Sequence, residues 1–254
     1  MTGGLIEGFQ KIFKGKNVVQ KQIFLISLVL VGLILQLVPH DNAMLILILL
    51  PVAIILTITS NLYTLHFLHN SVKFCVYRDR EDNIEKVKAI QIMPEINLNI
   101  FSHFWSWLGF IILWSLIWFA LGIVLNMLSA IPLLGLIFIL VSIIILFCDA
   151  FSFPIIYAKF AETYTIKGNL NFGNVFAYIP KIFVPVFFLY LKIILIALPL
   201  IFAAKIIYTM AAGNVTINFI GTAILMYITQ LIGFACTYEI ANIYYNRIKI
   251  EEDV

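Results

Sequence analysis

Charged residues are scarce in this sequence: Asp, Glu, Lys and Arg make up 11% of 254 residues, whereas hydrophobic residues make up 63%. The charged share of a soluble domain is about 25%. With a mean hydropathy of +1.05, the chain has more apolar surface than a soluble domain of this length can bury, so the lipid bilayer is its expected solvent. The formal net charge of +3 is too small to indicate binding to nucleic acid.

Motifs for catalysis and for cofactor binding are absent from the sequence. It contains no His-Glu-x-x-His, no Gly-x-Ser-x-Gly, no phosphate-binding glycine loop and no paired-carboxylate motif. We therefore expect no catalytic residue and no cofactor, and we favour a non-enzymatic role.

Histidines are few, and only two of them lie close together in the sequence. His66 and His69 are three residues apart and would share a helix face, where they could join His103 or Cys75 around a metal ion. Structural zinc sites normally have four ligands, supplied as two pairs. Because the sequence has no second pair, we expect interfacial histidines and no metal site.

Six long apolar runs dominate the sequence. Most exceed the roughly 20 residues that a helix needs to cross the hydrocarbon core. Spanning segments without strand-like alternation must be helices, because lipid offers the backbone no hydrogen-bond partners. The predicted fold is therefore all-α, a polytopic membrane helical bundle in one domain (1–254), with spans at about 23–38, 44–67, 105–128, 133–153, 182–208 and 217–241.

The positions of the basic residues predict how these helices are oriented. All Lys and Arg residues except Lys192 and Lys205, which is fourteen of sixteen, fall in four groups on alternate sides of the runs. Basic residues are retained in the cytoplasm during insertion. We therefore expect a plasma-membrane protein with three tight hairpins, both termini in the cytoplasm, and cytoplasmic segments at 1–22, 68–104, 154–181 and 242–254.

Cysteine is rare as well. The three cysteines, Cys75, Cys148 and Cys236, are predicted to lie on the cytoplasmic side or at cytoplasmic helix ends. Thiols stay reduced in that compartment, so no disulfide is expected.

The cytoplasmic segments contain amphipathic stretches. Before the third span, apolar residues recur at steps of three and four, which predicts a helix lying in the membrane interface. Similar stretches precede the first and fifth spans, and together they indicate a threefold repeat of interfacial helix, span, short turn and span. The candidate interfacial segment contains Pro94, Glu95, Phe101, Phe104 and Trp105.

The same region carries a family resemblance. A span that runs into a helix (Asn61–Tyr77) is followed by a short charged loop, the motif Met93-Pro94-Glu95 and the aromatic amphipathic segment Ile96–Gly109. The stretch from about Asn61 to Gly122 resembles an uncharacterised family of prokaryotic integral-membrane proteins, domain of unknown function 4013. Phe153–Phe176 and Thr237–Arg247 are similar to later parts of that family. The resemblance implies a membrane fold but no activity, because the role of the family is unknown.

Ionisable residues in or near the spans are the sharpest functional clue. Lys192 lies about 15 Å along the fifth span from its cytoplasmic start, where a charge costs roughly 2.5–3.5 kcal/mol. It should therefore have a partner, and Asp149 is the first choice, with Gln230 as a neutral neighbour. The candidate intramembrane polar cluster is Asp149, Lys192, Gln230 and Glu239. It is either a tether between helices, which we favour, or part of an ion or proton pathway.

The expected function is that of a non-enzymatic membrane component that acts through its cytoplasmic amphipathic face on lipid or on a partner protein. The alternative is a small transporter or channel that uses polar residues in the cytoplasmic half of helices 4 to 6. The expected partners are the lipid bilayer and a membrane or cytoplasmic protein. The sequence leaves open whether the protein forms an oligomer. A cavity that reaches Lys192 would favour transport, whereas a dry, packed bundle would favour the first function.

Overall fold

The structure, a computed structural model, describes residues 4–36, 43–78, 90–130, 135–169, 171–210 and 214–250. The regular elements in these ranges are all helical, which confirms the predicted fold class. The predicted turns between paired spans fall largely outside the described residues. In chain order the elements are α1 (Gly4–Ile12), α2 (Val18–Gln36), α3 (Ala43–Arg78), η2 (Leu98–Phe101), α5 (Phe104–Ser129), α6 (Gly135–Thr163), α7 (Phe172–Met210), α8 (Val215–Tyr244) and the π-helix η3 (Tyr245–Lys249).

Six helices in the described part of the chain are long and apolar enough to span a membrane: α2, α3, α5, α6, α7 and α8. The protein is therefore a multi-pass helical membrane bundle. Several helices extend beyond the predicted spans: α3 continues past residue 67 to Arg78, α6 continues past residue 153 to Thr163, and α7 begins at Phe172, ahead of residue 182. The predictions followed the end of the apolar run, whereas the helical backbone continues beyond it with polar residues.

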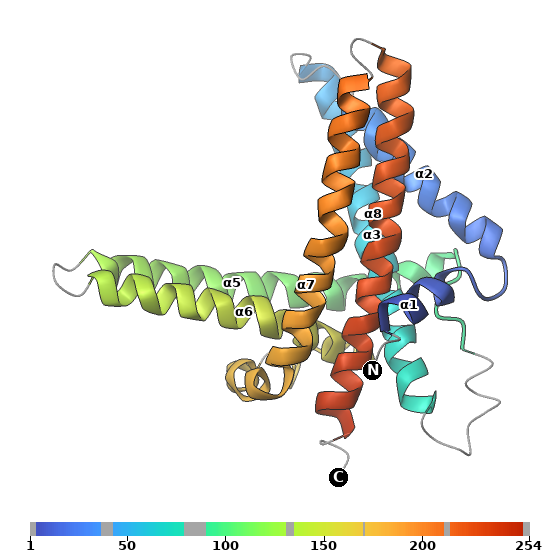
Figure 1. Ribbon diagram of the computed structural model, residues 1–254. Coiled ribbons are helices and arrows are strands. Elements are labelled where there is room, and N and C mark those ends of the chain that lie inside the picture. Colours follow the sequence, from blue (N-terminus) through green and yellow to red (C-terminus); the bar gives the residue numbers. More distant parts are fainter. Residues whose placement is uncertain are drawn as a thin grey trace.

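The helices are arranged in a column and an arm (Figure 1). In the column, α8 packs against α2, α3 and α7. The α5/α6 hairpin forms the arm, which leaves the column sideways and lies crosswise to it. Both marked ends of the chain lie at the same end of the column, which we call the basal end; the opposite end, where α2 and α7 finish, is the distal end.

The hydrophobic core lies toward the basal end, where α3, α6 and α8 meet. These three helices contact one another pairwise, and each is the second helix of its hairpin. The largest fully buried side chains there are Tyr63, Phe67, Phe160, Tyr238 and Tyr244. The distal halves instead expose apolar side chains on their outer faces, as expected for a lipid-facing surface.

Helix α1 packs directly on α8 at the basal end. A Cβ atom at Gly8 would lie 3.0 Å from the Ala235 carbonyl oxygen and 3.0 Å from the Tyr238 Cβ atom, so a larger residue would force α1 and α8 slightly apart. The Lys11 ammonium lies over the Phe74 ring, 3.9 Å from its centre, and burial lowers the pKa of Lys11. The first amphipathic stretch is thus a docked helix.

We expect Gly8→Leu to push α1 away from α8 and to cost about 1–3 kcal/mol, the usual range for overpacking. The measurement is limited proteolysis of the N-terminal segment in detergent together with thermal stability. Ile6→Leu is the control, because Ile6 is exposed on the same helix. Unchanged protease resistance in Gly8→Leu would contradict this packing.

Candidate functional site

Lys192 on α7 forms an ion pair with Glu239 on α8, and the distance from Lys192 Nζ to Glu239 Oε1 is 2.6 Å. The Glu239 side chain is 10% exposed and the Lys192 side chain is 43% exposed. The predicted pairing of Lys192 with Asp149 was therefore wrong. The two helices of the last hairpin are neighbours, so a lysine on one reaches a carboxylate on the other.

Asp149 instead belongs to the arm. It lies on α6, and the Trp114 indole of α5 hydrogen-bonds its carboxylate. Its Oδ1 atom is buried and accepts no hydrogen bond from the described residues. Asp149 thus links the two helices of the arm.

Gln230 lies on α8 nine residues before Glu239, which is about 14 Å along a helix. Its Oε1 atom is buried and has no hydrogen-bond partner among the described residues. The four residues of the predicted cluster therefore occupy three separate places: an ion pair, the arm and the wall of a cavity.

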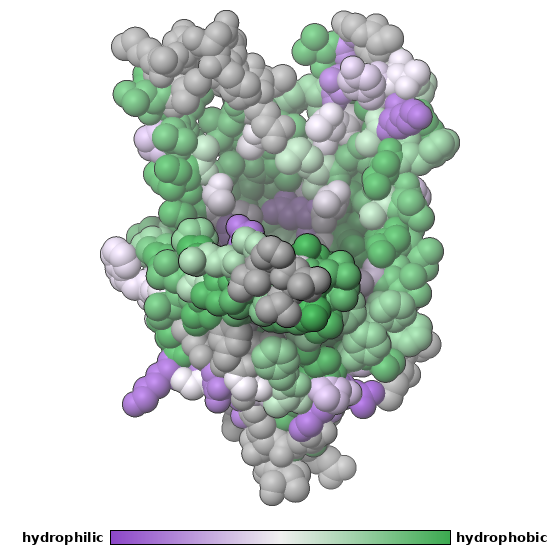
Figure 2. Space-filling view, turned by 90° about the vertical axis from the view of Figure 1, so that its left-hand side faces the viewer, coloured by the Kyte–Doolittle hydropathy of each residue, from purple (hydrophilic) through white to green (hydrophobic). Residues whose placement is uncertain are grey.

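That cavity, which we call the distal cavity, has a volume of about 800 Å³ and lies among α2, α3, α7 and α8. Figure 2 shows the hollow on the face from which the arm leaves, with hydrophilic surface deep inside it. Its lining consists of Leu28, Val29, Gly32, Leu56, Thr57, Ser60, Asn61, Ala204, Ile207, Tyr208, Asn218, Thr222, Leu225, Met226, Thr229 and Gln230. The apolar residues among them form the apolar part of the cavity wall.

A layer of buried side chains closes the distal cavity toward the basal end. Immediately basal to the lining residues Asn61 and Gln230, Leu62, Tyr63 and Leu231 are buried. The Tyr63 ring packs edge-on against Phe234, with ring centres 5.9 Å apart. The cavity is therefore closed on its basal side.

A second cavity of about 500 Å³, the basal cavity, lies beyond this layer and reaches Glu239. It is polar, and its charged side chains are partly paired: Arg78 lies 3.9 Å from Glu7 and donates a hydrogen bond of 3.4 Å to the Asn242 side chain. Its lining consists of Gly4, Glu7, Arg78, Pro185, Glu239, Asn242, Ile243, Asn246 and Arg247. Helix α8 therefore lines one cavity on each side of the buried layer.

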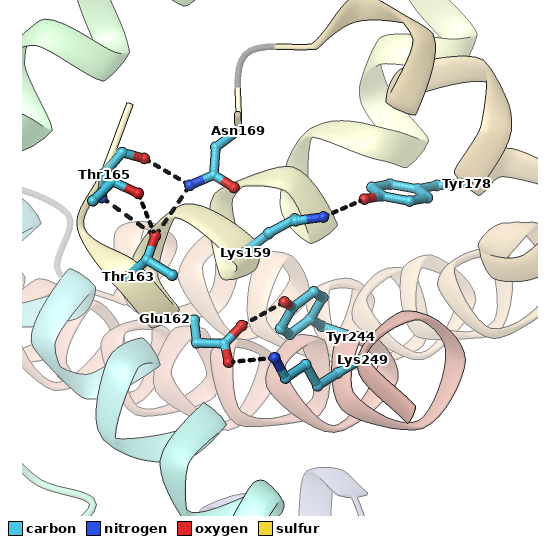
Figure 3. Close-up of polar contacts among 8 residues, drawn as sticks. All are labelled: Lys159, Glu162, Thr163, Thr165, Asn169, Tyr178, Tyr244 and Lys249. Carbon is cyan, nitrogen blue, oxygen red and sulfur yellow. Dashed lines mark hydrogen bonds and ion pairs between the residues drawn. The ribbon is translucent and has the colours of Figure 1, made fainter. Parts of the chain in front are cut away.

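A cluster of polar contacts anchors the root of the arm to the column (Figure 3). Glu162 at the end of α6 accepts a hydrogen bond of 2.6 Å from the Tyr244 hydroxyl and pairs with Lys249 at 3.2 Å. Lys159 on the same helix donates a hydrogen bond of 2.8 Å to the Tyr178 hydroxyl of α7. The sequence offered no sign of Glu162 beyond a charge at the end of an apolar run.

Three histidines of the described ranges surround Tyr164 at the basal end. His66 Nε2 donates to the Ile100 carbonyl oxygen at 3.0 Å, and the Tyr164 hydroxyl donates to His66 Nδ1 at 3.0 Å. Burial raises the pKa of Tyr164, which keeps this hydroxyl protonated. His103 stacks on the Tyr164 ring and His69 binds the Ala161 carbonyl oxygen. These contacts join α3, α5 and the end of α6, and no group of three metal-ligating side chains occurs within the described ranges.

The candidate interfacial segment is partly buried and partly exposed. Pro94 is buried, and its carbonyl oxygen accepts a hydrogen bond from Tyr63. Glu95, Phe101 and Trp105 are exposed, and Phe104 is half-buried. Instead of one amphipathic helix, the structure has the single turn η2, after which α5 begins at Phe104.

Sequence reasoning also missed Lys21, which it counted among the cytoplasmic basic residues. Lys21 is 3% exposed, and its ammonium donates to the Met93 carbonyl oxygen at 2.7 Å and to the Gln91 side chain at 3.1 Å. It therefore fixes the start of α2 to the segment before η2.

No family model, no curated protein and no solved structure is significantly similar to this chain. The resemblance to domain of unknown function 4013 therefore stays a prediction.

Proposed function

We propose that the protein is a plasma-membrane transporter for a small molecule, with both termini in the cytoplasm and the distal cavity open to the outside. The observation that carries this proposal is the distal cavity itself, which is closed toward the basal end by the Tyr63 and Phe234 layer. The basal cavity lies on the other side of that layer. Two cavities along one helix with a closed layer between them suit a carrier that opens to each side in turn, although Lys192 itself lines neither cavity.

The basic residues support this orientation. Lys11, Arg247 and Lys249 all belong to elements at the basal end, and basic residues are retained in the cytoplasm during insertion. The Lys192–Glu239 pair lies on the basal side of the buried layer, because Glu239 lines the basal cavity. The pair thus joins α7 to α8 at the wall of that cavity.

A second candidate function is the non-enzymatic membrane component predicted from the sequence. The observation that favours it is the exposed apolar surface around η2, where Leu98 is 86% exposed and Trp105 is 78% exposed. Such a surface suits insertion into lipid or contact with a protein partner. This second candidate function gives no role to the distal cavity, and for that reason we rank it second.

Cysteine labelling in proteoliposomes tests the transport proposal. Ser60 lies at the deep end of the distal cavity, so Ser60→Cys should react quickly with an uncharged, membrane-impermeant methanethiosulfonate glycoside added outside. Because a carrier also opens to the other side, the same cysteine should react from inside at a slower but measurable rate.

Two further variants serve as references. Asn246→Cys, in the basal cavity, should react from the inside only, and Ile55→Cys, on an exposed apolar face of α3, should react from neither side. Reaction of Ser60→Cys from one side only would show a static pocket instead of a carrier.

A further inference from the structure

The distal cavity has a lining that selects against ions. None of its sixteen described lining residues is Asp, Glu, Lys, Arg or His. An ion that entered would lose water without meeting an opposite charge, which is strongly unfavourable in an apolar environment. The lining therefore predicts an uncharged ligand.

Four of the eight polar side chains that line the cavity lie at its deep end, and the other four, Thr57, Tyr208, Asn218 and Thr222, lie farther toward the distal end. Ser60 and Asn61 come from α3, and Thr229 and Gln230 come from the facing part of α8. On the distal side of these deep-end side chains, the wall includes Leu56 and other apolar side chains. A ligand that matches both parts has a polar end and an apolar body.

Gln230 determines which hydrogen-bonding group the polar end of the ligand carries. Its Oε1 atom is buried and accepts no hydrogen bond from the part of the chain that the structure describes. A buried acceptor without a donor is costly, so a ligand that brings an O–H or N–H group gains a hydrogen bond once the Gln230 amide turns toward the cavity. A ligand with only acceptors cannot supply this hydrogen bond and can only accept from the amide N–H groups.

We propose that the distal cavity binds an uncharged amphipathic molecule whose hydroxyl or amide group donates a hydrogen bond to Gln230 and whose tail lies along the apolar wall. This inference rests on the proposed function, because it names the substrate class of the same site. The molecule comes either from the membrane, as an uncharged lipid, or from the water outside.

Protection of a cysteine tests this ligand class in nanodiscs. Thr222 lines the cavity, and the alkylation rate of Thr222→Cys is measured with four compounds that share one tail: dodecanol, dodecyl methyl ether, dodecanoate and dodecyltrimethylammonium. Dodecanol should protect at a concentration about fivefold lower than the ether, a ratio that corresponds to one neutral hydrogen bond. The two ions should not protect.

Replacement of Gln230 by leucine, in the Thr222→Cys chain, should remove the difference between dodecanol and the ether. Ser142→Ala, in the arm, is the matched control and should keep it. Equal protection by the alcohol and the ether before replacement of Gln230, or protection by an ion, would overturn the inference.

Didodecanoylglycerol identifies the source of the ligand. Protection by this lipid in addition to dodecanol supports entry from the membrane, and protection by dodecanol alone supports entry from water; both outcomes support the ligand class. The transport proposal can fail separately, because Ser60→Cys would then lack labelling from the inside while the protection pattern at Thr222→Cys persists.

Discussion

Lys192→Met is expected to lower the free energy of unfolding by about 2 kcal/mol, which is less than the loss for a fully buried ion pair because the Lys192 side chain is 43% exposed. The variant leaves the Glu239 carboxylate, with a side chain only 10% exposed, without its cation. The measurement is chemical denaturation in detergent, supported by the yield of folded protein.

The reverse variant, Glu239→Gln, should cost clearly less. Lys192 is 43% exposed, and its flexible stem can carry the ammonium toward water or toward lipid headgroups. The double variant Lys192→Met/Glu239→Gln should recover most of the stability lost in Lys192→Met, because no buried charge then remains unpaired.

Lys205→Met is the matched control for this series, since Lys205 is an exposed lysine on the same helix. It should change stability little. A Lys192→Met protein as stable as the wild type would contradict the assignment of Glu239 as a buried partner that depends on Lys192.

The second large effect is expected at the root of the arm. Glu162→Ala removes the acceptor of both Tyr244 and Lys249, and hydrogen bonds to charged groups contribute about 1.5–3 kcal/mol. We expect a loss of about 2 kcal/mol and a looser contact between α6 and α8. Disulfide cross-linking between cysteines introduced on these two helices measures the second effect.

Tyr244→Phe divides this loss into its parts, since it removes only one hydroxyl donor and should cost about 1 kcal/mol. Lys167→Ala, at an exposed position close to Glu162, is the control and should be neutral. If Glu162→Ala cost no more than Lys167→Ala, the contacts of Figure 3 would not anchor the arm.

The spans could be predicted from the sequence because the bilayer imposes one simple requirement, a long apolar run. For the third span the prediction of 105–128 agrees with α5, which begins at Phe104 and ends at Ser129. Where a helix continues into the interface the requirement no longer applies. Residues such as His69 and Lys73 are helical in α3 although they are polar, so the helix continues beyond the span that hydropathy marks, as the predicted helix over Asn61–Tyr77 requires.

The candidate site was predictable only in part. Lys192 and Glu239 stood out as ionisable residues in or near apolar runs, but their pairing depends on which helices become neighbours, which is a property of the fold. The distal cavity is built from residues such as Ser60 and Thr222, whose hydroxyl groups are common in membrane helices. Nothing in their sequence positions distinguishes them from polar residues that only contact their own helix.

The crosswise orientation of the arm affects how the arm lies in the surrounding membrane. A bilayer normal that follows α3 and α8 would leave the 26 residues of α5, about 39 Å long, running along the leaflets instead of through them. Both α5 and α6 carry exposed apolar side chains over most of their length, so lying flat and standing upright keep the same surface in contact with acyl chains. The hairpin can therefore meet the acyl chains in either orientation with an apolar surface.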